Sequence, residues 1–337
     1  MTAFSDLLVV QEVSPRDGLQ IEPTWVPTDK KIDLINQLST MGFSRIEAGS
    51  FVSPKAIPNL RDGEEVFTGI TRHKDIIYVG LIPNLKGALR AVEANANELN
   101  LVLSASQTHN LANMRMTKAQ SFAGFTEIVE QLQGKTQFNG TVATTFGCPF
   151  EGKISEKEVF NLVEHYLKLG IHNITLADTT GMANPVQVKR IVSHVLSLIS
   201  PEQLTLHFHN TRGLGLTNVL AAYEVGARRF DAALGGLGGC PFAPGASGNI
   251  CTEDLVNMCE EIGIPTTIDL DALIQLSRTL PALLGHDTPS QLAKAGRNTD
   301  LHPIPDYIKS ALLHKDLKCK APLIEPNLRR NLGKWST

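Results

Sequence analysis

The sequence NITLADTTGMANPVQVKRIVSHVLSLISPEQLTLH, residues 173–207, contains two short apolar runs with a longer amphipathic segment between them. Asn173–Ala177 and Leu204–His207 have the length and composition of buried strands, and Pro185–Ile199 has the helical spacing of apolar residues. A strand, a helix and a second strand in this order form a unit with parallel strands. The stretch therefore predicts an α/β fold.

The same alternation continues along the chain in both directions. The predicted strands are Leu7–Val13, Arg45–Ala48, Ile76–Ile82, Leu99–Ser104, Gly140–Thr145, Asn173–Ala177, Leu204–His207 and Arg229–Ala233. The predicted helices are Thr28–Met41, Asp62–Arg72, Leu85–Asn95, Lys118–Leu132, Ser155–Leu169, Pro185–Ile199, Gly215–Val225 and Thr252–Ile262. Eight strand–helix units in about 260 residues favour a closed (β/α)8 TIM barrel over an open doubly wound sheet.

The alternation stops after residue 265. We therefore predict a TIM-barrel catalytic domain over residues 1–265 and a C-terminal helical extension over residues 266–337, packed on the barrel. Within the extension, Asp269–Leu284 and Ile304–Leu313 have a helical pattern. From Lys294 onward there are nine Lys and Arg residues against four Asp and Glu residues. This basic end is consistent with a simple appendage and equally with binding of a partner or ligand.

The composition excludes several classes of protein. Of the 337 residues, 42% are hydrophobic and 19% are charged, which is typical of a folded chain rather than a disordered one. A net charge of −3 provides no basic surface for nucleic acid or an anionic membrane. The five cysteines are odd in number and lack Cys-x-x-Cys spacing, which indicates a reducing compartment. Without a membrane-spanning run or an N-terminal leader, we expect a cytoplasmic protein.

The carboxyl ends of the predicted strands carry a group of possible metal ligands. His207 and His209 alternate on a strand, so their side chains point to the same side. Such a pair alone is also consistent with hydrogen-bonded core histidines. Asp17, after the first strand, and Asn249, after the eighth, add a carboxylate and an amide oxygen at the same end of the barrel. This mixed nitrogen and oxygen set without a thiolate favours Mg²⁺ or Mn²⁺.

Three further polar residues are expected at the same end of the barrel. Arg16 is suited either to a structural ion pair or to the stabilisation of a developing oxyanion. Glu47 ends the second predicted strand and is suited to orienting the metal ligands. Asp178 ends the sixth strand, where it either acts in the same way or caps the helix that follows.

A glycine-rich segment follows the eighth predicted strand. Residues 235–249 read GGLGGCPFAPGASGN, so that six glycines surround Cys240. Glycine permits positive φ and close backbone approach at an entropic cost. A loop that closes over a site and brings one thiol to a reacting atom would explain this composition. The alternative is a flexible linker that contains a buried cysteine.

Several of these motifs together resemble one enzyme family. They are Val13-Ser-Pro-Arg-Asp-Gly-Leu-Gln20, Glu47-Ala-Gly-Ser-Phe-Val-Ser-Pro-Lys55, Pro83-Asn-Leu-Lys86, Gly147-Cys-Pro-Phe-Glu-Gly-Lys153, and the Cys240 loop with Ala246-Ser-Gly-Asn-Ile-Cys-Thr-Glu-Asp254. Over roughly residues 5–285 the chain is similar to the 3-hydroxy-3-methylglutaryl-CoA lyases. The resemblance implies a divalent-metal TIM-barrel lyase, a homodimer or higher homo-oligomer, that cleaves a 3-hydroxy acyl-CoA to acetyl-CoA and a keto product.

The resemblance also implies roles for particular residues. The implied metal ligands are Asp17, His207, His209 and Asn249; the implied catalytic residues are Arg16, Asp17, Glu47, Asp178, His207 and Cys240; and Asn84 and Lys86 fall in the motif expected to bind the acyl-CoA. Either Asp17 or His207 takes the proton of the substrate hydroxyl, and Cys240 protonates the enolate carbon. Two alternatives remain, a Claisen-type synthase, against which the Cys240 loop argues, and a non-catalytic acyl-CoA-binding barrel.

The chain departs from the family pattern near the histidines. It reads His207-Phe-His-Asn210-Thr-Arg212-Gly-Leu214 where the family has His-x-His-Asp-Thr-Tyr-Gly-Gln, and it has Gln107 where many relatives have glutamate. These changes leave the acyl group open, with a related 3-hydroxy acyl-CoA such as citramalyl-CoA as the alternative to hydroxymethylglutaryl-CoA. Arg212 is expected to favour a substrate carboxylate, to pair with an acidic neighbour, or to point to solvent.

Overall fold

The computed structural model describes residues 6–239 and 248–314. Eight strands close into a barrel in sequence order, and each strand is parallel to both of its neighbours. The strands are β1 (Val9–Glu12), β2 (Arg45–Ser50), β3 (Ile77–Ile82), β4 (Glu98–Ser104), β5 (Gln137–Ala143), β6 (Asn173–Asp178), β7 (Leu204–Phe208) and β8 (Arg229–Ala232). The predicted TIM barrel is confirmed.

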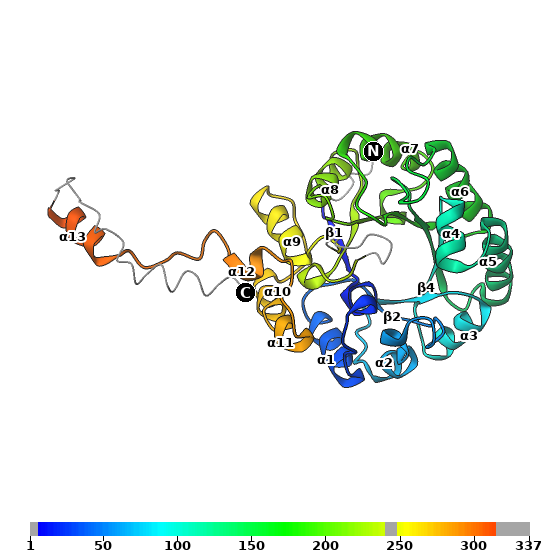
Figure 1. Cartoon of the computed structure of the whole chain (residues 1–337), viewed down its shortest axis with the longest axis horizontal. Coiled ribbons are helices and arrows are strands. Elements are labelled where there is room, and N and C mark those ends of the chain that lie inside the picture. Colours follow the sequence, from blue (N-terminus) through cyan, green and yellow to red (C-terminus); the bar gives the residue numbers. More distant parts are fainter. Residues whose placement is uncertain (1–5, 240–247, 315–337) are drawn as a thin grey trace. The chain divides into compact units, whose positions relative to one another are not determined.

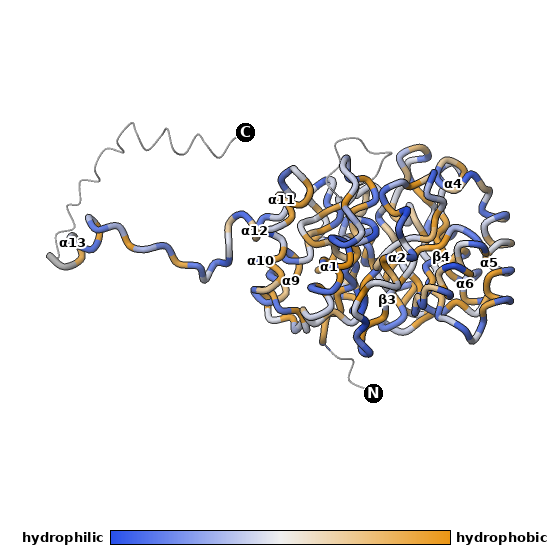
Figure 2. The backbone as a smooth tube through the Cα atoms, turned by 90° about the horizontal axis from the view of Figure 1, so that it is seen from below, coloured by the Kyte–Doolittle hydropathy of each residue, from blue (hydrophilic) through white to orange (hydrophobic). Residues whose placement is uncertain are grey.

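A ring of helices surrounds the barrel (Figure 1). These helices are α1 (Thr28–Leu38), α2 (Gly63–Gly69), α3 (Leu85–Glu93), α4 (Gln107–Met114), α5 (Lys118–Leu132), α6 (Glu156–Lys168), α7 (Pro185–Val195), α8 (Gly215–Glu224) and α9 (Thr252–Glu261). Hydrophobic and hydrophilic residues alternate along helices such as α1, α5 and α6 (Figure 2), because one side of each helix packs on the barrel. Helix α4 was not predicted.

The hydrophobic core lies between the barrel and the helices. In β4, Leu99, Leu101 and Leu103 are fully buried, whereas the intervening Asn100 takes part in a hydrogen-bonded polar group. Gly140 of β5 allows the close approach of α6, since a Cβ atom there would lie 2.6 Å from the ring of Tyr166. Along a strand, side chains therefore point alternately into the hydrophobic core and into the interior of the barrel.

The interior of the barrel is polar. Near the amino ends of the strands, Arg45 forms a buried ion pair with Glu98, and its Nε donates to Gln11 at 2.8 Å. Arg229 donates from Nε to Thr205. These contacts join β1 to β2, β2 to β4 across the interior, and β7 to β8. They give the buried charges the partners that burial requires.

The remaining helices are shorter than predicted. The predicted helix Asp269–Leu284 is two helices, α10 (Leu270–Ser277) and α11 (Leu280–Leu284), with Pro281 in the first turn of the second. Helix α12 (Leu292–Ala295), which was not predicted, follows, and Asp254 of α9 accepts hydrogen bonds from the N–H groups of Gln291 and Leu292.

The chain divides into two compact units, Met1–Gly296 and Arg297–Thr337. The second unit contains α13 (Asp306–His314). The boundary expected at residue 265 stays a prediction. Among the described residues, no helix combines the length and the apolar composition needed to cross a bilayer.

Candidate metal and catalytic site

The turn after β1 presents two charged side chains side by side. Ser14–Gly18 forms a single π-helical turn in which the N–H groups of Arg16, Asp17 and Gly18 all point to the carbonyl oxygen of Val13. Such turns are rare and occur frequently at functional sites. The turn places Arg16 and Asp17 at the carboxyl end of the barrel, where they contact each other.

Arg16 joins two carboxylates. Its Nη1 atom lies 2.5 Å from Asp17 Oδ1, and its Nε atom donates to Glu47 Oε2 at 2.6 Å. Burial lowers the pKa of the Arg16 guanidinium, but Glu47 and Asp17 outweigh this and raise the pKa above its ordinary value. The ion pair considered for Arg16 is therefore present, and it fixes the guanidinium beside Asp17.

Glu47 is held in turn by a chain of amides and hydroxyls across the barrel. Asn100 donates to Glu47 Oε1 at 3.0 Å, and Asn139 donates to Asn100 Oδ1 at 3.0 Å and to Thr175 Oγ1 at 3.0 Å. The sequence patterns did not single out these residues, although polar residues at inward positions of buried strands are a visible signal. This series of hydrogen bonds holds the Arg16–Glu47 pair from the interior of the barrel.

His207 and His209 lie together beside Asp17, as predicted from their spacing. The Nε2 atoms of His207 and His209 are 4.0 Å and 3.9 Å from Asp17 Oδ2. One ligand atom from each of the three residues falls within 4.8 Å of the others, and all three residues are buried. Two imidazoles and a carboxylate facing one point are a metal-ligating arrangement.

The protonation states of Asp17 and His209 favour the binding of a cation. Burial raises the pKa of Asp17, but Arg16 and the two histidines outweigh it and lower the pKa to about 2. Burial and the neighbouring His207 lower the pKa of His209 to about 3. At neutral pH the carboxylate is therefore charged, and the His209 ring is neutral with a free electron pair.

Asn249 lies beside the same carboxylate. The backbones of Asn249 and His209 form an isolated antiparallel β-bridge. The Asn249 Nδ2 atom donates to Asp17 Oδ2 at 2.8 Å and to the Leu237 carbonyl oxygen at 2.9 Å. Its Oδ1 atom is buried without a hydrogen-bond partner among the described residues. An unpaired buried oxygen next to Asp17 is consistent with a ligand that the protein itself does not supply.

Glycine is required where the segment before Cys240 passes this group. Gly238 has a φ of 100°, and a Cβ atom there would lie 2.7 Å from Asn249 Nδ2 and 3.0 Å from the Asp17 carbonyl oxygen. The backbone thus closes tightly over Asp17 and Asn249. Cys240 itself lies outside the described residues.

Asp178 lies at the end of β6 and does not cap α7. Asn184 is the N-cap of α7, whereas Asp178 Oδ1 accepts hydrogen bonds from the N–H groups of Met182 and Ala183 at 2.7 Å and 3.1 Å. Burial raises the pKa of Asp178 to about 6, against these hydrogen bonds. Its Oδ2 atom is buried without a partner among the described residues.

The three remaining predicted residues lie near the same end of the barrel. Asn84 is the exposed N-cap of α3 and accepts a hydrogen bond from the Gly87 N–H at 3.0 Å; Lys86 is exposed in the first turn of that helix. Arg212 donates from Nη1 to the carbonyl oxygens of Thr180 and Gly181 at 2.8 Å and 2.9 Å. Arg212 thus contacts the turn that follows Asp178 rather than pointing only to solvent.

Asp231 of β8 is a site neighbour that the sequence patterns missed. Its Oδ2 atom lies 3.1 Å from His207 Nδ1. A carboxylate in the middle of the predicted strand Arg229–Ala233 was the available signal. Nothing local indicates which side chain it faces, because β7 and β8 are joined through a helix.

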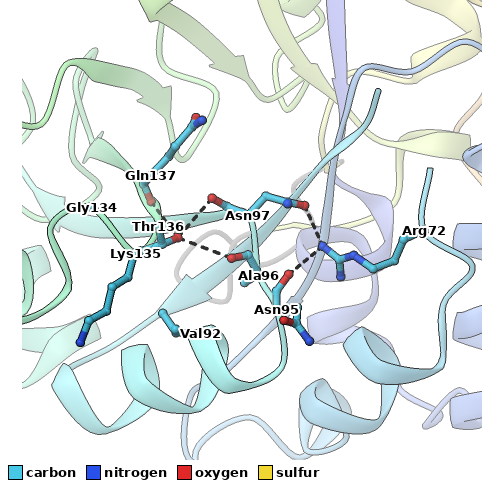
Figure 3. Close-up of a pocket in the computed structure, with 9 residues that line it drawn as sticks. All are labelled: Arg72, Val92, Asn95, Ala96, Asn97, Gly134, Lys135, Thr136 and Gln137. Atoms are coloured by element: carbon cyan, nitrogen blue, oxygen red, sulfur yellow. Dashed lines mark hydrogen bonds between the residues drawn. The ribbon is translucent and has the colours of Figure 1, made fainter. Parts of the chain in front are cut away.

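A separate cavity of about 790 Å³ lies at the amino end of the barrel, before β4 and β5 (Figure 3). Arg72 lines it and donates to the Asn95 carbonyl and to Asn97 Oδ1, both at 2.7 Å. None of the predicted site residues lines this cavity.

Known proteins are similar to this chain over most of its length. Residues 8–280 match the family model described as HMGL-like. The chain is 41% identical over 289 residues to the hydroxymethylglutaryl-CoA lyase YngG of Bacillus subtilis, covering 84% of this chain and 95% of that protein. It is also 41% identical over 303 residues to the (R)-citramalyl-CoA lyase of Chloroflexus aurantiacus, covering 86% of this chain and 95% of that protein.

A solved structure is more similar still. It is described as an HMG-CoA lyase from Acinetobacter baumannii in complex with coenzyme A and 3-methylmalate, and it is 99% identical with a TM-score of 0.89. The match covers 90% of this chain and 100% of that chain.

Proposed function

Because the chain belongs to the HMGL-like family, we propose that it is a carbon–carbon lyase that cleaves a 3-hydroxy-3-methyl acyl-CoA. The products are acetyl-CoA and a keto acid, which is acetoacetate when the substrate is hydroxymethylglutaryl-CoA. The observation that carries the proposal is the buried group of Asp17, His207 and His209 with Arg16 against it.

The residues fit a divalent metal ion. Asp17 Oδ2 and the two Nε2 atoms face one another at distances too long for hydrogen bonds, and Asn249 Oδ1 is buried and unpaired among the described residues. We propose Asp17, His207, His209 and Asn249 as the ligands and Mg²⁺ or Mn²⁺ as the ion. The ion would supply positive charge beside the substrate hydroxyl and lower its pKa.

The protein side chains divide the remaining work. Asp17 or His207 accepts the hydroxyl proton as the carbonyl forms and the bond to the acetyl-CoA carbon breaks. The electron pair of that bond becomes the acetyl-CoA enolate, whose charge Arg16 stabilises. Glu47 holds the Arg16 guanidinium in place. Asp178 interacts electrostatically with His207 and Arg212 and is proposed as a further catalytic residue. Cys240 donates the proton that converts the enolate carbon to a methyl group.

Asn84 and Lys86 are proposed to bind the coenzyme A part of the substrate. Both are exposed at the carboxyl end of β3, on the side of the barrel where Asp17 lies. Lys86 places a positive charge there that suits a phosphate. Asn84 also caps α3, so its replacement is expected to affect the helix as well.

Product analysis tests the proposal directly. Purified protein with Mg²⁺ is mixed with hydroxymethylglutaryl-CoA, and acetyl-CoA and acetoacetate are measured. Equal amounts of both products support the proposal, and full turnover after exhaustive chelation would overturn the metal-dependent mechanism. Absence of acetyl-CoA release from every 3-hydroxy-3-methyl acyl-CoA in a panel would overturn the lyase function.

Citramalyl-CoA is the second candidate substrate. A relative at 41% identity is an (R)-citramalyl-CoA lyase, and the 99% identical structure contains 3-methylmalate, a short hydroxydicarboxylic acid. Cleavage of citramalyl-CoA gives acetyl-CoA and pyruvate, so the co-product separates the two substrates. Incubation of acetyl-CoA with several 2-oxo acids tests the Claisen-type synthase alternative.

We further propose a homodimer or higher homo-oligomer in the cytoplasm. The family resemblance supports the assembly, and the odd number of cysteines supports a reducing compartment. Light scattering of the eluting protein measures its mass in solution.

A further inference from the structure

Asp231 lies against the ring nitrogen of His207 that faces away from Asp17. His207 of β7 and Asp231 of β8 are register partners in the barrel, and Asp231 Oδ2 lies 3.1 Å from His207 Nδ1. The other ring nitrogen, Nε2, is the one that lies 4.0 Å from Asp17 Oδ2. The imidazole therefore stands between two carboxylates, one at each nitrogen.

The surroundings of Asp231 do not favour the stability of the fold. The residue is 5% exposed, and its Oδ1 atom has no hydrogen-bond partner among the described residues. An unsatisfied buried oxygen of this kind is destabilising. The carboxylate is nevertheless placed so that its other oxygen meets His207.

Among the described residues, His209 has no carboxylate at its Nδ1 atom. His209 Nδ1 is buried without a hydrogen-bond partner among the described residues, although its Nε2 atom faces Asp17 in the same way as that of His207. The two imidazoles are thus held differently. Only His207 has a carboxylate that selects one ring nitrogen as the donor.

We propose that Asp231 is a positioning residue for His207. By accepting the Nδ1–H of His207, it fixes the ring tautomer in which Nε2 carries the free electron pair that points toward Asp17 and His209. Asp231 acts through His207. The part of the inference that concerns metal affinity rests on the proposed metal site, whereas the tautomer itself does not.

The tautomer is measured first, on the wild-type protein without metal. Nitrogen-15 NMR of the histidine rings, at a pH where the His207 ring is neutral, should show His207 protonated at Nδ1; its signal is identified by its loss in His207→Asn. Protonation at Nε2 would overturn the proposal. This measurement needs no variant at position 231, so a variant that fails to fold does not affect it.

Metal affinity is measured second, by Mn²⁺ titration followed by electron paramagnetic resonance. Asp231→Asn keeps the side-chain shape but removes the charge, and it should weaken Mn²⁺ binding by about 10–100-fold, the usual effect of losing such a partner. The matched control is Thr205→Val, two residues before His207 on β7, where the hydroxyl contacts Arg229 instead. The control should bind Mn²⁺ like the wild type.

Three outcomes are informative. Unchanged Mn²⁺ affinity in Asp231→Asn, or an equal loss in Thr205→Val, would overturn the positioning role. If wild-type protein binds no Mn²⁺, the proposed metal site fails while the tautomer result still decides the role of Asp231. A Nδ1-protonated ring together with the expected loss in Asp231→Asn alone supports both.

Discussion

The Nε2 atom of His209 lies 3.9 Å from Asp17 Oδ2. The distance is too long for a hydrogen bond, yet both atoms carry electron pairs and both residues are buried. Two atoms with electron pairs at this distance can both bind a positive ion placed between them. This relationship leads to the first prediction.

His209→Ala is expected to weaken Mg²⁺ or Mn²⁺ binding by at least about 10–100-fold, because even the loss of a residue that supports a ligand has this effect. Chelation should abolish cleavage, and added Mg²⁺ or Mn²⁺ should restore it. Isothermal titration with Mn²⁺ measures the affinity. The control is His172→Ala, which removes an exposed histidine. Equal affinity in the two variants would contradict the assignment of His209 as a ligand.

Cys240→Ala is expected to reduce kcat by about 10²–10⁴, the range for losing a positioned acid, without changing metal affinity. Cys259→Ala is the matched control, since Cys259 is fully buried in α9 and burial raises the pKa of its thiol to about 12. Steady-state kinetics of both variants test this. Normal turnover in Cys240→Ala would mean that another group protonates the enolate.

Glu12 is expected to make stability depend on pH. It is fully buried on β1, and burial raises its pKa from 4.5 to about 7, against hydrogen bonds from Ser14, Leu234 and Thr252. Between these values the folded protein binds more protons than the unfolded chain. The stability contributed by this group therefore falls as pH rises from 4.5 to about 7.

Glu12→Gln removes this dependence, since the amide carries no titrating charge. Its oxygen can still accept from the Ser14 and Leu234 N–H groups, and its NH2 group can donate to the Thr252 hydroxyl oxygen. Relative to the variant, the free energy of unfolding of the wild type should fall by up to about 3 kcal/mol as the pH rises from 4.5 to about 7. Urea unfolding at several pH values measures the difference. Glu224→Gln, which alters an exposed carboxylate on α8, is the control. Parallel profiles for wild type and Glu12→Gln would show that the Glu12 pKa is not raised.

Arg212→Tyr is expected to change substrate preference. The guanidinium contacts the turn after Asp178 through Nη1, and it has five N–H donors in all, so it can also meet a substrate carboxylate. Loss of a charged hydrogen bond of about 1.5–3 kcal/mol shifts the ratio of kcat/KM values tenfold or more. Hydroxymethylglutaryl-CoA and citramalyl-CoA are compared, with Arg190→Tyr as the control. An unchanged ratio would mean that Arg212 holds the turn but does not select the substrate.

The sequence by itself was enough to predict the barrel and to place His207 and His209, two of the proposed metal ligands, on one side of a strand. Strand and helix periods are local, so the alternation seen in residues 173–207 predicts parallel strands wherever it recurs. The His207-x-His209 spacing likewise places two rings on one side of a strand without knowledge of any partner. Helix α4 was not predicted because it is short, at eight residues, and contains few apolar residues.

The tertiary structure decided which polar groups meet. The contact of His207 with Asp231 and the hydrogen-bonded chain from Glu47 to Thr175 depend on register between strands. Hydrogen bonds between neighbouring strands of a closed barrel join residues separated by a whole helix. No local pattern in the chain specifies that register, because it is set when the barrel closes.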